Sequence, residues 1–572
     1  MSRVRVWAPA PESVAVRVDG ADVAMTPDGG GWWSGPDLPP GTDYAFVLDG
    51  GEPLPDPASR WQPYGVHRAS RIYDQGAYAW RDDGWRGRSF EDAVIYEAHV
   101  GTFTPGATLD SAIERLDHLV ELGITHVELL PLNAFNGVWN WGYDGVAWYA
   151  VHQAYCYPDG SATGGPDAFK RFVDAAHARG LAVVLDVVYN HLGPSGNYWP
   201  QFGPCFKPDR NTWGDLINFD ETAVRAHVID NALMWLRDFH VDALRLDAVH
   251  ALRDTQPRHI LRELADAVAA LRADTGREIT LIAESDLNDV QQVVDGWDLD
   301  AQWDDDVHHA LHVALTGETK GYYADFAPFD TLAKVFTRAF LHDGTHSSFR
   351  QRDWGRPIAP NTPGSRFVVC LQNHDQVGNR AVGDRLPELT TPALVKVGAV
   401  LLLTSPFVPM LFMGEEWAAS TRWPFFTSHP EPELAEATGQ GRLAEFADHG
   451  WDVSAMIDPQ DPRAYHEAVL RWDEREQGFH AEVLALYREL IELRAAEPDL
   501  RCRDLAGVRV SVASGSRTLV LSRGSFVVLA NLGASPVDFA VTGDVVLATG
   551  GVRAAGTGTR LAPETAAVLR RR

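Results

Sequence analysis

The stretch VDALRLDAVHAL, Val241 to Leu252, has the pattern of a short buried strand that ends in charged residues. Because residues i and i+2 of an extended chain point to the same side, Arg245 and Asp247 are expected to lie side by side at the end of this strand. Such a pair can also be a structural salt bridge without chemistry. Two further acids, Glu284 and Asp375, follow later apolar runs in the same way. Acids at the ends of several strands favour a catalytic role and suggest sugar chemistry.

Short apolar runs alternate with amphipathic segments from about residue 90 onward. The candidate strands are residues 94–99, 125–130, 181–188, 241–247, 279–284, 299–304, 366–373 and 408–413. Segments between them, such as LDSAIERLDHLVELG and PDAFKRFVDAAHARG, have apolar residues at helical spacing and a closing glycine. Eight such units predict an α/β fold of the (β/α)8 TIM barrel type, whose active site lies at the C-terminal ends of the strands.

At the two ends of the chain, apolar and polar residues alternate in short runs separated by turn-forming residues, a pattern typical of antiparallel strands. We therefore expect an N-terminal, Ig-like β-sandwich over residues 1–88, the barrel over 89–500 and a C-terminal β-domain over 501–572. The N-terminal module could bind carbohydrate or shape the substrate cleft, or it could serve packing alone.

Composition excludes several classes of partner. Asp and Glu outnumber Lys and Arg by 78 to 50, a net charge of −28, so we expect no nucleic-acid partner. The longest apolar run, 397–413, contains two prolines and is shorter than the roughly 18 residues of a membrane span. The N-terminus has no apolar signal core, and the cysteines form no CxxC pair, which favours a cytoplasmic protein with reduced thiols. The four cysteines are Cys156, Cys205, Cys370 and Cys502.

A retaining glycosidase needs two carboxyl groups about 5 Å apart, one to attack the anomeric carbon and one to protonate the leaving oxygen. Asp247 and Glu284 follow neighbouring strands and can meet this requirement. Arg245 would keep Asp247 ionised, as a nucleophile must be. An apolar surround would raise the pKa of Glu284, so that this carboxyl group keeps the proton that a general acid must supply. Asp375 would bind ring hydroxyls and help to stabilise the oxocarbenium-like transition state.

Four motifs in order resemble the signature regions of the α-amylase superfamily, glycoside hydrolase family 13. They are DVVYNH (186–191), LRLDAVH (244–250), IAESD (282–286) and QNHDQ (372–376). Stretches such as YEAHVGTFTP (96–105) and DAQWDDDVHHALHVALTGE (300–318) resemble one branch, the maltooligosyltrehalose trehalohydrolases. This resemblance implies cleavage of the α-1,4 bond next to the terminal trehalose unit of maltooligosyl trehalose, with release of trehalose and a maltooligosaccharide.

The resemblance also implies site residues: Asp247 as the nucleophile, Glu284 as the proton donor and Asp375 as the transition-state stabiliser. The predicted substrate-binding residues are Tyr143, Trp141, His191, Arg245, His250, Asp305, Asp306, His308, His309, His374, Gln376 and Asn379.

Two of these assignments have a second interpretation. The acidic and histidine cluster at 304–309 could recognise trehalose by hydrogen bonding, or it could be the solvated acidic start of a helix. Trp139 and Trp141 could form a sugar platform or could pack in the core. The loop 192–220 lacks a dense carboxylate cage, so we expect no metal and no cofactor.

Two other functions remain open. A glycogen branching or debranching enzyme would share the same acids, and a catalytically silent glucan-binding protein could use the same barrel. The expected partners are maltooligosyl trehalose and related α-glucans, and we expect a monomer or a dimer that binds neither nucleic acid nor membrane.

Overall fold

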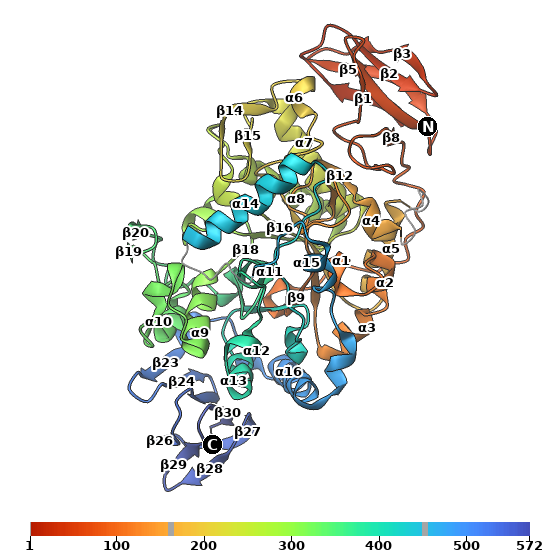
Figure 1. The fold of residues 1–572 in the computed structure, drawn as a ribbon. Helices are drawn as coiled ribbons and strands as arrows, with labels where there is room; N and C mark the ends of the chain where they lie inside the picture. Colours follow the sequence, from red (N-terminus) through yellow and green to blue (C-terminus); the bar gives the residue numbers. More distant parts are fainter. Residues whose placement is uncertain (1, 158–164, 449–455, 572) are drawn as a thin grey trace.

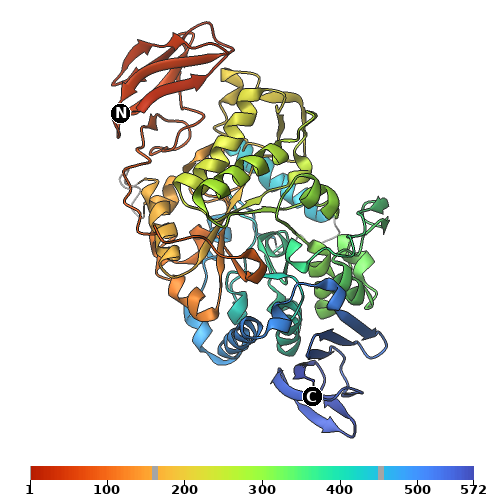
Figure 2. The ribbon, with the colours of Figure 1, turned by 180° about the vertical axis from the view of Figure 1, so that it is seen from behind.

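The computed structural model describes residues 2–157, 165–448 and 456–571. A small β-structure at the N-terminus and another at the C-terminus lie at opposite ends of a large central barrel (Figures 1 and 2). The predicted bounds of the three domains, 1–88, 89–500 and 501–572, stay a prediction.

The central part is a closed barrel of parallel strands, and all the predicted strands are confirmed. In chain order they are β9 (Ile95–Ala98), β10 (His126–Leu129), β13 (Ala182–Val187), β16 (Ala243–Leu246), β17 (Thr280–Ala283), β18 (Ala301–Trp303), β21 (Phe367–Cys370) and β22 (Val408–Phe412). Every residue of these strands is buried, because helices cover the outside and side chains fill the inside. The register sets Arg245 of β16 beside Asp186 of β13, so a cation and an acid from adjacent strands share one layer.

Amphipathic helices surround the barrel. The segment after β9 forms α2 (Leu109–Ile113) and α3 (Leu116–Leu122), and α3 ends at Gly123, whose φ of 92° is the left-handed conformation that glycine adopts without strain. The other outer helices include α5 (Asp167–His177), α8 (Ile260–Thr275), α9 (Asp305–Thr316), α10 (Thr331–Arg338), α13 (Pro392–Leu403) and α16 (Gly478–Ala496). The apolar run 397–413 is therefore the end of helix α13 followed by strand β22, as its prolines indicated, and no helix of the described residues could span a membrane.

Beyond the paired strands β11 (Asn133–Ala134) and β12 (Ala147–Val151) that follow β10, three further insertions with described residues lie between the barrel elements. The first, after β13, contains α6 (Trp199–Phe202), the hairpin β14 (Phe206–Arg210) and β15 (Asp215–Ile217), and it leads into α7 (Thr222–Leu233). The second carries the hairpin of β19 (Thr345–Ser347) and β20 (Arg352–Trp354), which the ion pair of Arg350 with Asp286 ties to the end of β17. The third contains α14 (Pro432–Asp448).

The N-terminal part is a sandwich of two antiparallel sheets, as predicted. One sheet is formed by β1 (Ser2–Trp7), β5 (Trp32–Leu38) and β4 (Thr26–Pro27), and the other by β3 (Ala21–Ala24), β2 (Val14–Val18), β6 (Asp43–Leu48) and β7 (Pro53–Leu54), with β8 (Ser70–Arg71) beside β6. Their alternating apolar residues form a separate core, which Phe202 of α6 also enters. The barrel insertion is thus packed into the sandwich.

The C-terminal part consists of two further sheets, confirming a β-domain there. The larger sheet contains β23 (Arg509–Ala513), β24 (Thr518–Arg523), β25 (Phe526–Asn531), β30 (Thr565–Arg570) and β27 (Asp544–Ala548), and the smaller contains β26 (Val537–Phe539), β29 (Gly558–Leu561) and β28 (Val552–Ala555). Buried Arg523 donates to the carbonyls of Thr404 and Ser405, both at 2.8 Å, which anchors this domain to the end of α13.

Candidate active site

Arg245 lies at the centre of a charged cluster inside the barrel mouth. Its side chain is fully buried, and its Nη1 donates to Asp247 Oδ1 at 2.6 Å and to Asp186 Oδ2 at 3.0 Å. Its Nη2 lies 3.9 Å from Glu284 Oε2. Asp247 and Glu284 therefore flank a single guanidinium, and the two candidate catalytic carboxyl groups share one compartment.

The turn that follows β16 contacts the Glu284 carboxyl group directly. Ala248 adopts a φ of 41°, a left-handed conformation that is unfavourable for a residue with a side chain. In this conformation the backbone N–H of Ala248 donates to Glu284 Oε2 at 2.7 Å. On the other side, Asn190 Nδ2 donates to Asp247 Oδ2 at 2.7 Å. Both carboxyl groups are thereby held in fixed orientations.

Glu284 has the protonation state that a general acid requires. Burial raises its pKa to about 8, with further increases from the charges of Asp247, Asp375 and Asp305, against the opposing effect of Arg245. The carboxyl group is therefore mostly protonated at neutral pH. A carboxylic acid that keeps its proton next to a carboxylate is the arrangement used in glycosidases for leaving-group protonation.

Asp375 lies in α11 (His374–Gly378), just beyond the end of β21. Its side chain is 43% exposed, more than that of Asp247 or Glu284, and lies 3.5 Å from His374 Nε2. Asn379 Nδ2 donates to its Oδ1 at 3.1 Å. An exposed, oriented carboxylate at the rim of the cluster can accept hydrogen bonds from sugar hydroxyls.

A chain of hydrogen bonds links His374 to the central cluster. Glu97, at the end of β9, contacts His374 Nδ1 at 2.6 Å through one oxygen and accepts from the backbone N–H of the same residue at 2.8 Å. His374 Nε2 lies 2.8 Å from the Tyr143 hydroxyl, which donates to Asp186 Oδ2 at 2.6 Å. Burial alone would lower the pKa of His374, but the charges of Asp375 and Glu97 outweigh it and raise the pKa to about 9.

We expect Glu97→Gln to weaken catalysis by about 10-fold to 100-fold in kcat, because the imidazolium loses the buried charge that stabilises it. The pKa of His374, followed by NMR titration of the ring protons, should fall in the same variant. Conversion to Gln keeps the size of the side chain, so the thermal unfolding temperature reports whether the fold is preserved. An unchanged His374 pKa would contradict this positioning role.

His191 and His250, two more of the predicted histidines, contact amide and backbone groups. His191 contacts Asn190 Oδ1 at 2.6 Å and the Tyr143 carbonyl at 3.0 Å, and its ring stacks on Trp213, with centroids 6.3 Å apart. His250 accepts from the backbone N–H of Asp286 at 3.3 Å, so its Nε2 is the nitrogen that carries the proton. Burial lowers the pKa of both rings, which favours neutral imidazoles.

The predicted cluster at the start of α9 divides into two groups. Asp305 is partly exposed, and burial together with the Asp375 charge raises its pKa to about 7. Asp306, in contrast, is buried, and its Oδ2 accepts from the backbone N–H groups of Leu341 at 2.7 Å and His342 at 3.0 Å. The structure therefore places Asp305 at the site and Asp306 behind it, where it holds the loop that leads to the β19–β20 hairpin.

The histidines of the same helix also face inward. His308 is buried and stacks on His312, with centroids 5.5 Å apart, while His309 is partly exposed and stacks on Tyr322, with centroids 4.8 Å apart. Burial lowers the pKa of both His308 and His309 well below the usual value, so both rings are neutral. His308 therefore lies within the core, and its predicted role in substrate binding stays a prediction.

Aromatic and amide residues complete the surroundings of His374. Trp141 is buried and stacks on Trp423, with centroids 4.6 Å apart, so its ring packs in the core instead of forming an open platform. Tyr143 stacks on His374, with centroids 5.2 Å apart. Gln376 and Asn379 are both partly exposed, and Asn379 Oδ1 accepts from Arg442 of α14, which connects the third insertion to the site.

Sequence reasoning did not select three residues that the structure brings into this network: Glu97, Asp186 and Asn190. Asp186 and Asn190 lie within the quoted motif DVVYNH, and Glu97 lies within YEAHVGTFTP. The signal that could have found Asp186 and Glu97 is the one used for Asp247, an acid near the C-terminal end of a barrel strand.

Within the described residues, no group of three or more His, Cys, Asp or Glu side chains is arranged to hold a metal ion. The amide of Asn190, just before the loop 192–220, is engaged by Asp247 and His191. The absence of a required metal stays a prediction.

Comparison with known proteins agrees with this geometry. Residues 83–204 match the family model "Alpha amylase, catalytic domain", and residues 503–569 match a domain of unknown function. The chain is 53% identical to malto-oligosyltrehalose trehalohydrolase from Arthrobacter ramosus, over 99% of both chains, and 50% identical to that from Rhizobium sp. (strain M-11), over 99% of this chain and 97% of the other.

A solved structure is similar over the whole fold. The crystal structure of a Salmonella typhimurium protein described as an alpha amylase superposes with a TM-score of 0.91 at 39% identity, covering 100% of this chain and 97% of that one. The chain therefore belongs to the malto-oligosyltrehalose trehalohydrolase family of α-amylase-type glycosidases.

Proposed function

We propose that this protein hydrolyses the α-1,4 bond next to the terminal trehalose unit of maltooligosyl trehalose and releases trehalose and a maltooligosaccharide. The observation that carries the proposal is the shared contact of Asp247 and Glu284 with Arg245, at 2.6 Å and 3.9 Å. The chain is 53% and 50% identical to the two trehalohydrolases over 99% of its length, which supports maltooligosyl trehalose as the substrate.

In the first step, an Asp247 carboxylate oxygen attacks the anomeric carbon of the maltooligosaccharide unit while the bond to the trehalose oxygen breaks. Glu284 transfers its proton to that oxygen, so trehalose leaves as a neutral alcohol. Arg245 and Asn190 orient Asp247 for this attack. Asp375 contacts the hydroxyls of the reacting sugar, whose ring carries the developing charge, and the positively charged His374 lies 3.5 Å from the Asp375 carboxylate and orients it.

In the second step, water enters the position vacated by trehalose. Glu284, now ionised, takes a proton from the water, and the resulting oxygen nucleophile displaces Asp247 from the anomeric carbon. Two inversions give net retention, so the maltooligosaccharide is released as the α-anomer. Asp247 is then free for another turnover.

Incubation with maltopentaosyl trehalose tests the assignment. Free trehalose should appear together with maltopentaose, and NMR of the fresh product should show the α-anomer. Branched or transferred glucans without trehalose would favour a branching enzyme, and binding without any cleavage would favour a silent glucan-binding protein.

The pH dependence of kcat/KM should follow the proton of Glu284. Because the acid must be protonated and its pKa is about 8, we expect a decline of about tenfold per pH unit above pH 8. Initial rates measured at low substrate between pH 6 and 10 check this. With a maltosyl fluoride, whose leaving group needs no proton, the same decline should be absent from the first step.

Asp305→Ala and Asp306→Ala form a matched pair. Asp305→Ala should lower kcat/KM for maltotriosyl trehalose at least about tenfold more than for a maltooligosaccharide of equal length, because one ligand-facing carboxylate is lost. Asp306→Ala should instead destabilise the fold by about 1–3 kcal/mol, because two backbone donors lose their acceptor. Kinetics on both substrates and thermal unfolding of both variants separate these roles, and equal losses on the two substrates would contradict the role of Asp305.

A further inference from the structure

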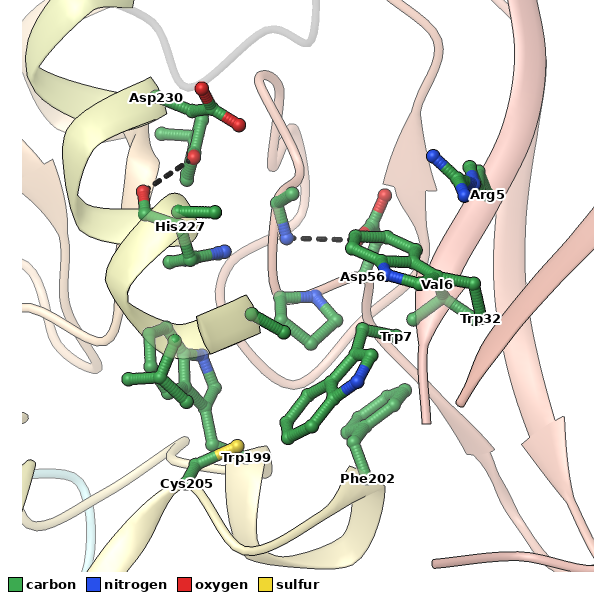
Figure 3. Close-up of a pocket in the computed structure, with 16 residues that line it drawn as sticks. Arg5, Val6, Trp7, Trp32, Asp56, Trp199, Phe202, Cys205, His227 and Asp230 are labelled. Atoms are coloured by element: carbon green, nitrogen blue, oxygen red, sulfur yellow. Dashed lines mark hydrogen bonds between the residues drawn. The ribbon is translucent and has the colours of Figure 1, made fainter. Parts of the chain in front are cut away.

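A cavity of about 140 Å³ lies where the N-terminal sandwich meets the barrel (Figure 3). Strands β1 and β5 and the segment after β7 form one wall, and α6 and α7 form the other. Its lining includes Trp7, Trp32, Asp56, Trp199, His227 and Asp230. None of the acids of the active site contributes to it. A more open groove of about 640 Å³ adjoins it and shares both Trp7 and Trp32.

Flat aromatic faces form one side of this cavity. Trp7 and Trp32 occupy directly paired positions on β1 and β5, so their side chains lie on the same face of the sheet. The neighbouring Trp33 packs with the sandwich core, whereas Trp7 packs with the core of the barrel. The pair therefore faces away from the sandwich interior and toward α7, as Figure 3 shows.

The opposite side supplies polar atoms without partners. Trp199 is only 4% exposed, and within the described part of the chain neither its Nε1 nor the buried Nε2 of His227 has a hydrogen-bond partner. Burial lowers the pKa of His227 to about 3, so its ring is neutral and can donate through one nitrogen and accept through the other. A buried donor without a partner costs about 1–3 kcal/mol, which a ligand can recover.

Two carboxyl groups, those of Asp56 and Asp230, also line the cavity. Asp56 is buried, its Oδ2 accepts from the Tyr44 hydroxyl at 2.6 Å, and its Oδ1 accepts from the N–H of Ala58 at 2.8 Å, so its position is fixed. Asp230 is on the exposed face of α7. Arg5 also lines the cavity but is paired with Asp28 at 3.2 Å, so the two acids still disfavour an anion. No metal-binding cluster exists among the described residues. Polar atoms in the walls disfavour a purely apolar ligand.

We infer that this cavity is a second sugar-binding site, which holds one glucose unit of an α-1,4-glucan while the rest of the glucan lies in the adjoining groove. A pyranose ring has apolar C–H faces that pack on indole rings and hydroxyl groups at its edge that pair with His227, Trp199 and Asp56. The volume is below the roughly 300 Å³ of pockets for larger ligands, which fits a single ring. The choice of an α-glucan among neutral sugars rests on the proposed function.

The fold connects this site with the active site. The first insertion runs from His191, beside Asp247, to the cavity residues of α6 and α7. A long glucan held at the second site would raise the local concentration of chain ends near the cleft. The second site would therefore matter most for long substrates.

Two variants test the site in the full-length protein. Ala226 is exposed on α7 and lines both the cavity and the groove, so Ala226→Phe fills the space without removing a wall. Trp32→Ala removes one stacking face. Each is combined with Asp247→Asn, which prevents turnover, and titrated with maltotriose by calorimetry. The Asp247→Asn protein should bind two maltotriose molecules per chain, and each double variant should lose affinity at one site by at least about tenfold.

Ala269→Phe on α8, also exposed but lining neither the cavity nor the groove, is the matched control and should keep both sites. One site per chain in the Asp247→Asn protein, or two unaltered sites in both double variants, would overturn the inference. If the wild-type protein still releases trehalose in that case, only the proposal of a second site is contradicted. If trehalose is never released but the double variants do lose the second site, only the hydrolase proposal is contradicted.

Discussion

Replacing Asp247 with Ala is expected to lower kcat for maltooligosyl trehalose by about 10⁵-fold, about 7 kcal/mol of transition-state stabilisation. The reason is that no other group can form the glycosyl intermediate. Asp186, the other acid bonded to Arg245, is fully enclosed, and burial raises its pKa to about 6 despite the Arg245 charge. Single-turnover kinetics with maltopentaosyl trehalose measures the loss.

Rescue chemistry distinguishes a lost nucleophile from a damaged fold. In Asp247→Ala, azide can occupy the space of the missing carboxylate and attack the anomeric carbon, so a β-maltooligosyl azide should form. The Asp247→Asn variant keeps the size of the side chain but fills this space, and it should show no rescue. Appreciable hydrolysis by both variants would remove Asp247 from the nucleophile role.

Glu284→Gln is expected to lower kcat for maltooligosyl trehalose by about 10³-fold, the usual contribution of general acid catalysis. The N–H of Ala248 donates to Glu284 at 2.7 Å, and Gln retains an oxygen that can accept this hydrogen bond. The local turn should therefore persist. What is lost is the proton that burial keeps on the carboxyl group. Steady-state rates of the purified variant measure this effect.

The leaving group separates the two acids experimentally. Fluoride leaves maltosyl fluoride without protonation, so Glu284→Gln should still form the glycosyl intermediate at a rate within about tenfold of wild type, whereas Asp247→Ala should not. Fluoride release followed with an ion-selective electrode gives both rates. If Glu284→Gln is equally slow with the fluoride and with maltooligosyl trehalose, Glu284 does not act as the acid.

Several features were within reach of sequence reasoning because they depend on periodicity. Short apolar runs alternating with amphipathic segments predicted every barrel strand, and the i, i+2 spacing of Arg245 and Asp247 predicted their contact, which the structure has at 2.6 Å. The raised pKa of Glu284 was likewise expected, from an apolar surround, and burial is its main cause in the structure. Strand position alone indicates that such residues reach the mouth of a barrel.

Helical and loop residues were harder to predict, because their orientation depends on long-range packing. Asp305 and Asp306 are adjacent in sequence, yet one side chain is at the site and the other accepts from the backbone of residues 341 and 342. Trp141 is turned into the core by Trp423, which lies 282 positions later in the chain. No local pattern contains that information.

By itself, the sequence determined the barrel, the flanking β-domains and the strand ends that carry Asp247 and Glu284, since strand and helix periods are local properties of the chain. Only the tertiary structure decided that Glu97 and Asp186 join the catalytic network, that Asp306 and His308 lie behind it, and that the sandwich and α7 enclose a separate cavity. The physical reason is that burial and hydrogen-bond partners are set by residues far apart in sequence, whose packing fixes which polar groups remain free to meet a ligand.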